Sequence, residues 1–122
     1  PGEINATQIT NNPQDEELLR KAMDIVEKNL ENADFSADDF CREMGMSRSN
    51  LHLKLKSITG ESAIEFIRKI RFNNACKLLK EGRHTIAEIS TMVGFNSPSY
   101  FATSFKKYMG CMPTEYVKNL RI

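Results

Sequence analysis

Apolar residues recur along this chain at the three- and four-residue spacing of amphipathic helices, from Asp15 almost to the C-terminus. Three acidic residues open the first such segment, where they suit the positive end of a helix dipole. Its apolar stripe consists of Leu18, Leu19, Ala22, Ile25, Val26 and Leu30. Residues 1–14 are polar and aperiodic, which indicates a linker or tail. Since no segment shows the alternation of a strand, the pattern predicts an all-α fold.

Caps and glycines divide the rest of the chain into six further helices. Ser36 and Ser47 are placed as N-caps, and Gly45 and Gly60 follow the apolar stripes that these caps begin. Pro113 suits the first turn of the last helix, because that position needs no N–H for the helix ladder. The six expected helices span residues 36–44, 47–59, 62–80, 85–93, 97–109 and 113–120. With the segment that starts at Asp15, the prediction is seven helices.

An internal repeat relates two parts of this pattern. The segment Met44-Gly45-Met46 corresponds to Val93-Gly94-Phe95 at an offset of 49 residues. At an offset of 50, the next helix matches in its apolar and basic positions: Leu51, Leu55 and Lys56 against Phe101, Phe105 and Lys106. Each copy has helix-turn-helix form, with a glycine that adopts the left-handed turn at little cost. The repeat predicts a first helix-turn-helix subdomain at 15–60, a linking helix at 61–82 and a second subdomain at 83–122.

Composition excludes several classes of protein. The 122 residues are 40% hydrophobic and 27% charged, and no apolar run is long enough for a membrane span. Cys41, Cys76 and Cys111 are 35 residues apart and form no CxxC pair, which argues against a disulfide framework or a zinc site. No nucleophile elbow, phosphate loop or paired carboxylate site is present. We therefore expect a soluble cytoplasmic protein that is not an enzyme, holds no metal or cofactor and makes no membrane contact.

Charge is distributed unevenly along the chain. Residues 1–46 carry 11 acidic and 4 basic side chains, whereas residues 47–122 carry 5 acidic and 13 basic ones. A chain polarised in this way can present a basic face with an acidic block behind it. Solvated helix faces sorted by chance are the alternative.

The second copy closely resembles the DNA-binding domain of AraC/XylS-type bacterial transcription activators. The matching motifs are Ile86-Ala87-Glu88-Ile89, Gly94-Phe95, Ser97-Pro98-Ser99-Tyr100-Phe101, Phe105-Lys106-Lys107 and Gly110-Cys111-Met112-Pro113. The linking helix adds Arg71, Ala75, Leu78 and Leu79 at the family spacing. The resemblance implies sequence-specific binding to double-stranded DNA, with the acidic first helix placed away from it. It also implies recruitment of RNA polymerase and upstream sensor or dimerisation domains, including those of hybrid two-component regulators. The family often has Arg where this chain has Leu53, Thr103 and Val117, which weakens the case for Arg-to-guanine contacts at the first two.

Helical geometry then selects a candidate DNA surface, opposite the apolar stripe of the second helix in each copy. The expected base-reading residues are Ser49, His52, Leu53, Ser99, Ala102 and Thr103. The expected phosphate-binding residues are Ser47, Arg48, Lys54, Lys56, Asn96, Ser97, Lys106 and Lys107. Leu53 either contacts a thymine methyl or packs against a neighbouring helix.

The length of the linking helix bears on how both copies meet DNA. About 18–20 residues give roughly 27–30 Å, somewhat less than the ~34 Å helical repeat of DNA. One monomer would then place two recognition helices in successive major-groove segments, with bent DNA or with incomplete engagement of one copy. An all-helical protein-interaction module without specific DNA binding is the competing hypothesis.

Overall fold

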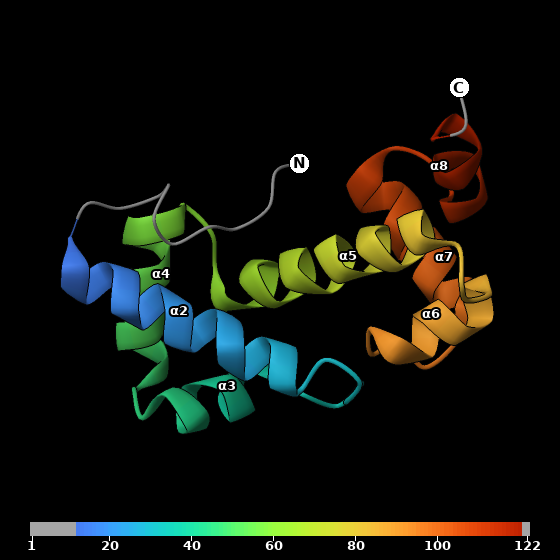
Figure 1. The fold of residues 1–122 in the computed structure, drawn as a ribbon. Coiled ribbons are helices and arrows are strands. Elements are labelled where there is room, and N and C mark those ends of the chain that lie inside the picture. The colour runs from blue at the N-terminus through green and yellow to red at the C-terminus, as the bar shows by residue number, and fades with distance from the viewer. Residues whose placement is uncertain (1–11, 121–122) are drawn as a thin grey trace. The chain divides into compact units, whose positions relative to one another are not determined.

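The computed structural model describes residues 12–120, and within that range its regular structure is α-helical with no strand (Figure 1). The helices are α2 (Pro13–Lys28), α3 (Ala37–Met44), α4 (Arg48–Thr59), α5 (Ala63–Glu81), α6 (Ile86–Met92), α7 (Pro98–Met109) and α8 (Pro113–Asn119). These seven correspond one for one to the helices expected from the sequence. The all-α prediction is confirmed.

The start of α2 differs from the prediction. The Oδ1 atom of Asn12 accepts hydrogen bonds from the backbone N–H of Gln14 at 2.9 Å and of Asp15 at 3.4 Å. Pro13 follows at the first helical position, where its missing N–H costs nothing. Positions 13 and 14, which were assigned to the linker, therefore belong to the first turn of the helix, and the linker prediction is wrong there. Residues 1–11 of that prediction lie outside the described residues.

The two copies of the repeat share the same local pattern of cap and glycine. The Oγ atom of Ser47 accepts from Asn50 N–H at 3.1 Å, and the Oγ atom of Ser97 accepts from Tyr100 N–H at 3.1 Å. Both helices end at a glycine with positive φ, 79° at Gly60 and 89° at Gly110. L-residues with a Cβ avoid this conformation, so these glycines fix where α4 and α7 stop.

The chain divides into two compact units. Among the described residues, the α4 unit comprises 12–29 and 34–70, and the α7 unit comprises 30–33 and 71–120. Helix α5 contributes its first part to the α4 unit and its second part to the α7 unit.

Each unit has its own core. In the α4 unit, aliphatic side chains of α2 and α4 are buried with a stacked pair of rings, Phe40 and Phe66, whose centroids are 5.9 Å apart. In the α7 unit, Phe72 is fully buried and its ring meets four others. Those partners are Phe95, Phe101, Phe105 and Tyr108, with centroids 4.9–6.4 Å from that of Phe72. The cores orient α4 and α7 by burying one face of each helix.

Candidate nucleic-acid interface

Helix α4 presents a polar face on the side opposite its buried one. Leu51 and Leu55 are fully buried, whereas Ser49, His52 and Leu53 are all exposed. Leu53 has 66% of its surface exposed, so it does not pack against a neighbouring helix. An apolar side chain left in solvent on a polar face is free to contact a ligand. The base-reading role of these residues stays a prediction.

Helix α7 repeats this arrangement with different chemistry. Phe101 is fully buried, Ser99 and Thr103 are exposed, and Ala102 is half-buried. The Thr103 hydroxyl donates to the Ser99 carbonyl oxygen at 2.9 Å, one helical turn back. With its hydrogen committed to the helix, Thr103 offers its methyl group and oxygen lone pairs to a base edge.

The sequence analysis did not place Tyr100 among the site residues. The residue is 62% exposed, and its ring packs against that of Phe95 with centroids 5.5 Å apart. In the repeat it occupies the position held by Asn50 in α4. The helical wheel places it about 100° from the core-facing direction, so the periodicity that selected Ser99 also contained this signal.

The predicted phosphate-binding residues fall into three groups. The side chains of Ser47 and Ser97 cap α4 and α7, so a phosphate contact there would rest on backbone N–H groups, as predicted for these two residues and for Asn96. A second group is exposed on the outward side of the helices, and no acidic residue in the described part of the chain forms an ion pair with its members. It consists of Lys56, Lys106 and Lys107.

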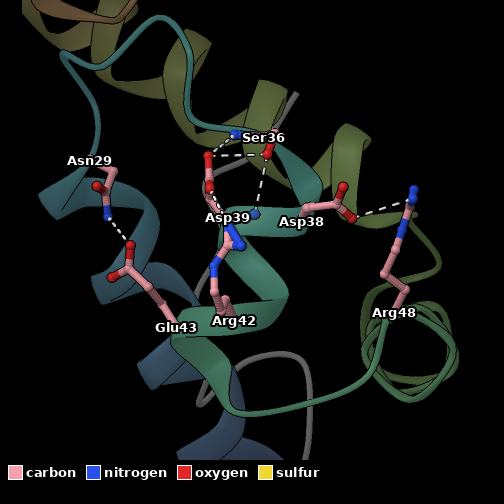
Figure 2. Close-up of polar contacts among 7 residues, drawn as sticks. All are labelled: Asn29, Ser36, Asp38, Asp39, Arg42, Glu43 and Arg48. Atoms are coloured by element: carbon pink, nitrogen blue, oxygen red, sulfur yellow. Dashed lines mark hydrogen bonds and ion pairs between the residues drawn. The ribbon is translucent and has the colours of Figure 1, made fainter.

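The third group consists of Arg48 and Lys54, which flank the buried face of α4. Arg48 Nη1 lies 3.3 Å from Asp38 Oδ1 of α3, and Figure 2 shows the two side chains extended toward each other. Lys54 Nζ lies 3.5 Å from Asp15 Oδ1 of α2. Both cations therefore already have a carboxylate partner within the α4 unit. Sequence reasoning missed these partners because the contacts join different helices.

A buried guanidinium fixes the turn that leads into α7. Arg71 is 7% exposed, and its Nη1 donates to the carbonyl oxygens of Leu30 at 2.6 Å and Val93 at 2.7 Å, while Nη2 donates to that of Asn32 at 3.0 Å. Burial lowers the pKa of Arg71 from its ordinary value. Gly94 has a φ of +85°, and a Cβ on it would clash with Arg71 Nη1 and with the backbone oxygen of Leu30. Glycine is required there on both grounds.

Among the residues that the structure describes, no group of three or more His, Cys, Asp or Glu side chains is arranged to hold a metal ion. Over the same residues, every helix is too short or too polar to cross a lipid bilayer.

The chain is similar in sequence and in structure to known proteins. A family model described as "Helix-turn-helix domain" matches residues 40–119. The chain is 41% identical over 113 residues to Histidine kinase P4 of Formosa agariphila, covering 93% of this chain and 8% of that protein. The chain spans less than half the length of the curated relatives it matches.

Solved structures with the same fold are known. The C-terminal domain of AraT, a response regulator from Geobacillus stearothermophilus, superposes with a TM-score of 0.75 at 30% identity and covers 84% of each chain. A transcriptional regulator from Chromobacterium violaceum, described by its AraC-type DNA-binding domain, gives 0.76 at 26% identity, over 88% of this chain and 95% of that one.

Proposed function

The chain belongs to the AraC-type helix-turn-helix family, and from that premise we propose that it is the sequence-specific DNA-binding domain of a bacterial transcription regulator. One observation carries the proposal. Both α4 and α7 have a serine N-cap, two buried apolar side chains at equivalent positions and a glycine at the C-terminal end, and both leave a polar face in solvent. A helix of this kind fits the roughly 12 Å width of the DNA major groove.

Base reading is assigned to the outward faces of the two helices. In α4, Ser49 and His52 supply hydrogen-bonding groups and Leu53 an apolar contact to a thymine methyl. In α7, Ser99 supplies a hydroxyl and Thr103 a methyl group, because the Thr103 hydrogen is used within the helix. Ala102 adds a small apolar surface beside them.

Phosphate contacts are assigned first to the lysines that form no ion pair in the described part of the chain, Lys56, Lys106 and Lys107. Such contacts set the register of the protein on DNA and carry no sequence information themselves. Tyr100, exposed in the first turn of α7, is a further candidate for the DNA backbone through its hydroxyl.

Both recognition helices are proposed to act from one monomer. The 19 residues of α5 form a helix of about 28 Å, and successive major-groove segments on one face of DNA are about 34 Å apart. The shortfall favours bent DNA, or full engagement by only one helix.

The rest of the regulator is proposed from its relatives. The names of two of them, a histidine kinase and a response regulator, support a place for this chain as the output domain of a longer two-component protein. Such a protein would sense a signal upstream, act in the cytoplasm and activate transcription by recruiting RNA polymerase.

Selection from a randomised duplex pool, followed by titration of the enriched duplex at several salt concentrations, tests this function. Two conserved blocks about one helical turn apart would support reading by both helices. A single block would assign one helix to backbone anchoring. Failure to enrich any sequence, with binding that hardly changes with salt, would favour the protein-interaction module, since phosphate contacts release counterions.

A further inference from the structure

We propose that Asp15 and Asp38 compete with DNA phosphates for the two cations that flank α4, and so reduce the share of DNA affinity that this helix supplies. The inference rests on the proposed function, because it concerns how strongly α4 engages the DNA backbone. It assigns a role to two acidic residues that lie outside the recognition helix and are not expected to touch DNA.

The geometry of the two ion pairs supports this competition. Asp38 lies in the first turn of α3 and Arg48 in the first turn of α4, with both side chains more than 60% exposed (Figure 2). Asp15 lies in the first turn of α2, with 24% of its side chain exposed, and the Lys54 side chain is 54% exposed. All four groups remain within reach of solvent, so a phosphate can displace each carboxylate without unfolding of the unit.

The other acidic residues near the two ion pairs have basic partners of their own. Asp39 in the same turn as Asp38 is occupied by Arg42 and by the Ser36 cap, so it does not share Arg48 (Figure 2). On α2, Glu16 is paired with Arg20. Asp38 and Asp15 are therefore the carboxylates that form ion pairs with Arg48 and Lys54. Glu65 also acts electrostatically on Lys56, and Asp38 on Arg42, without an ion pair in either case.

Helix α7 has no equivalent of this arrangement. The positions that correspond to Arg48 and Lys54 are Pro98 and Ser104, which carry no charge. The competition is thus confined to the α4 unit.

Counterion release gives the competition a measurable signature. A cation that neutralises a phosphate normally releases about 0.9 of a salt cation from DNA. When Arg48 or Lys54 moves to a phosphate, the carboxylate it leaves behind attracts a salt cation in its place. Net release is then smaller, and α4 contributes less to both affinity and salt dependence than its number of basic residues suggests.

The experiment compares Asp38→Asn and Asp15→Asn with the matched control Asp24→Asn, which removes the same charge from an ion pair internal to α2, 3.1 Å from Lys28. Affinity is measured for the enriched duplex and for a random-sequence duplex of equal length. We expect each of the first two variants to bind both duplexes about twofold to fivefold more tightly, the range expected for exposed ion pairs, and with a steeper salt dependence. The control should change affinity by a smaller factor.

A double variant separates the ion pair from general charge. Adding Arg48→Ala to Asp38→Asn should return affinity close to the wild-type value, whereas Arg48→Ala alone should change it little. If Asp38→Asn gains no more than Asp24→Asn, or keeps its gain without Arg48, the competition is refuted. Thermal melts of each variant check that α3 still folds.

The outcomes also distinguish this inference from the function beneath it. A wild-type chain that binds no duplex even at low salt overturns the proposed function and the inference with it. A wild-type chain that binds with steep salt dependence, together with aspartate variants that match the control, overturns the inference alone.

Discussion

The α4 unit and the α7 unit share a helix-turn-helix pattern but differ in what surrounds it. Among the described residues, the α4 unit carries 11 acidic and 9 basic side chains, and the α7 unit carries 4 acidic and 7 basic ones. Their cores differ as well, because a row of three rings in the α4 unit, Phe35, Phe40 and Phe66, contrasts with a five-ring cluster around Phe72 in the α7 unit.

This difference teaches that a repeated pattern preserves backbone geometry without preserving chemistry. The caps, buried positions and glycines that shape α4 recur in α7. The net charge changes sign between the units, from −2 to +3 over the described residues. We therefore expect the α7 unit to supply most of the electrostatic attraction to DNA.

The largest expected effect tests the contrast between the cores. Phe72→Ala should destabilise the protein by about 3–5 kcal/mol, from lost burial and the cavity left behind. Phe66→Ala should cost less, because Phe66 meets one ring where Phe72 meets four, and each pair adds about 0.5–1.5 kcal/mol. Urea unfolding monitored by circular dichroism measures the free energy of unfolding of both variants. Equal losses of stability would show that the larger aromatic cluster does not make the core of the α7 unit more sensitive to truncation.

The next effect concerns phosphate contacts. Lys106→Ala should weaken binding to all duplexes by about fivefold to tenfold and flatten the salt dependence by about one unit. Lys54→Ala should flatten it by less than half as much, because Lys54 already has Asp15 as a partner. Fluorescence anisotropy at four or more salt concentrations gives both slopes. If Lys54→Ala flattens the salt dependence of DNA affinity as much as Lys106→Ala does, the two lysines make equal phosphate contacts and the contrast between the units is contradicted.

A smaller effect is expected on base preference. Thr103→Ala should change the preferred base at one or two positions, by about 1 kcal/mol, because it removes the methyl and hydroxyl groups and leaves the phosphate contacts in place. Leu53→Ala should do the same in the other half of the site. Repeating the duplex selection with each variant maps the positions. If both variants lose affinity uniformly for every sequence, the base-reading faces are misassigned.

The smallest effect is expected on acid stability. Hydrogen bonding to Arg42 and to the Ser36 cap lowers the pKa of Asp39, and the Ser62 cap lowers that of Glu65; both are in the α4 unit. In the α7 unit the Thr85 cap lowers the pKa of Glu88. A carboxylate with a lowered folded pKa stabilises the fold above its ordinary pKa, and this contribution is lost as pH falls through the lowered value.

The α4 unit, with two such carboxylates, should therefore loosen first below about pH 4. Amide exchange resolved by residue, compared between pH 5 and pH 3, measures the order of opening. The variant Asp39→Asn should reduce the amide protection that the α4 unit loses between pH 5 and pH 3, which brings the two units closer in acid sensitivity. Glu88→Gln should reduce the corresponding loss in the α7 unit, because its contribution is already absent at pH 5, and so should increase the difference in acid sensitivity. Simultaneous opening of both units at pH 3 would contradict this order.

The sequence predicts the helices well because their ends are set locally. Ser36 as a cap and Gly45 as a stop are both within four residues of the backbone groups they satisfy, so reading them needs no knowledge of the fold. The start at Pro13 was missed because Asn and Pro also mark loops, and only the direction of the Asn12 side chain distinguishes the two uses.

The candidate site was predicted less completely. Outward positions such as Ser49 and Leu53 follow from helical periodicity, and the structure leaves both exposed. The partners of Arg48 and Lys54 come from other helices, Asp38 on α3 and Asp15 on α2, and no spacing in the sequence indicates such contacts. The electrostatic state of a basic residue depends on tertiary neighbours, which periodicity does not contain.

The contact between Arg71 and Gly94 has a consequence for how this domain can change by descent. If Gly94 were replaced first, its new Cβ would clash with the Arg71 guanidinium. If Arg71 were replaced first, three backbone carbonyl groups would lose their shared hydrogen-bond donor, those of Leu30, Asn32 and Val93. Because either single replacement is expected to destabilise this junction, the two residues are expected to be inherited as a pair. The outward residues of α7 are under no such constraint, so its DNA preference can diverge while this junction stays fixed.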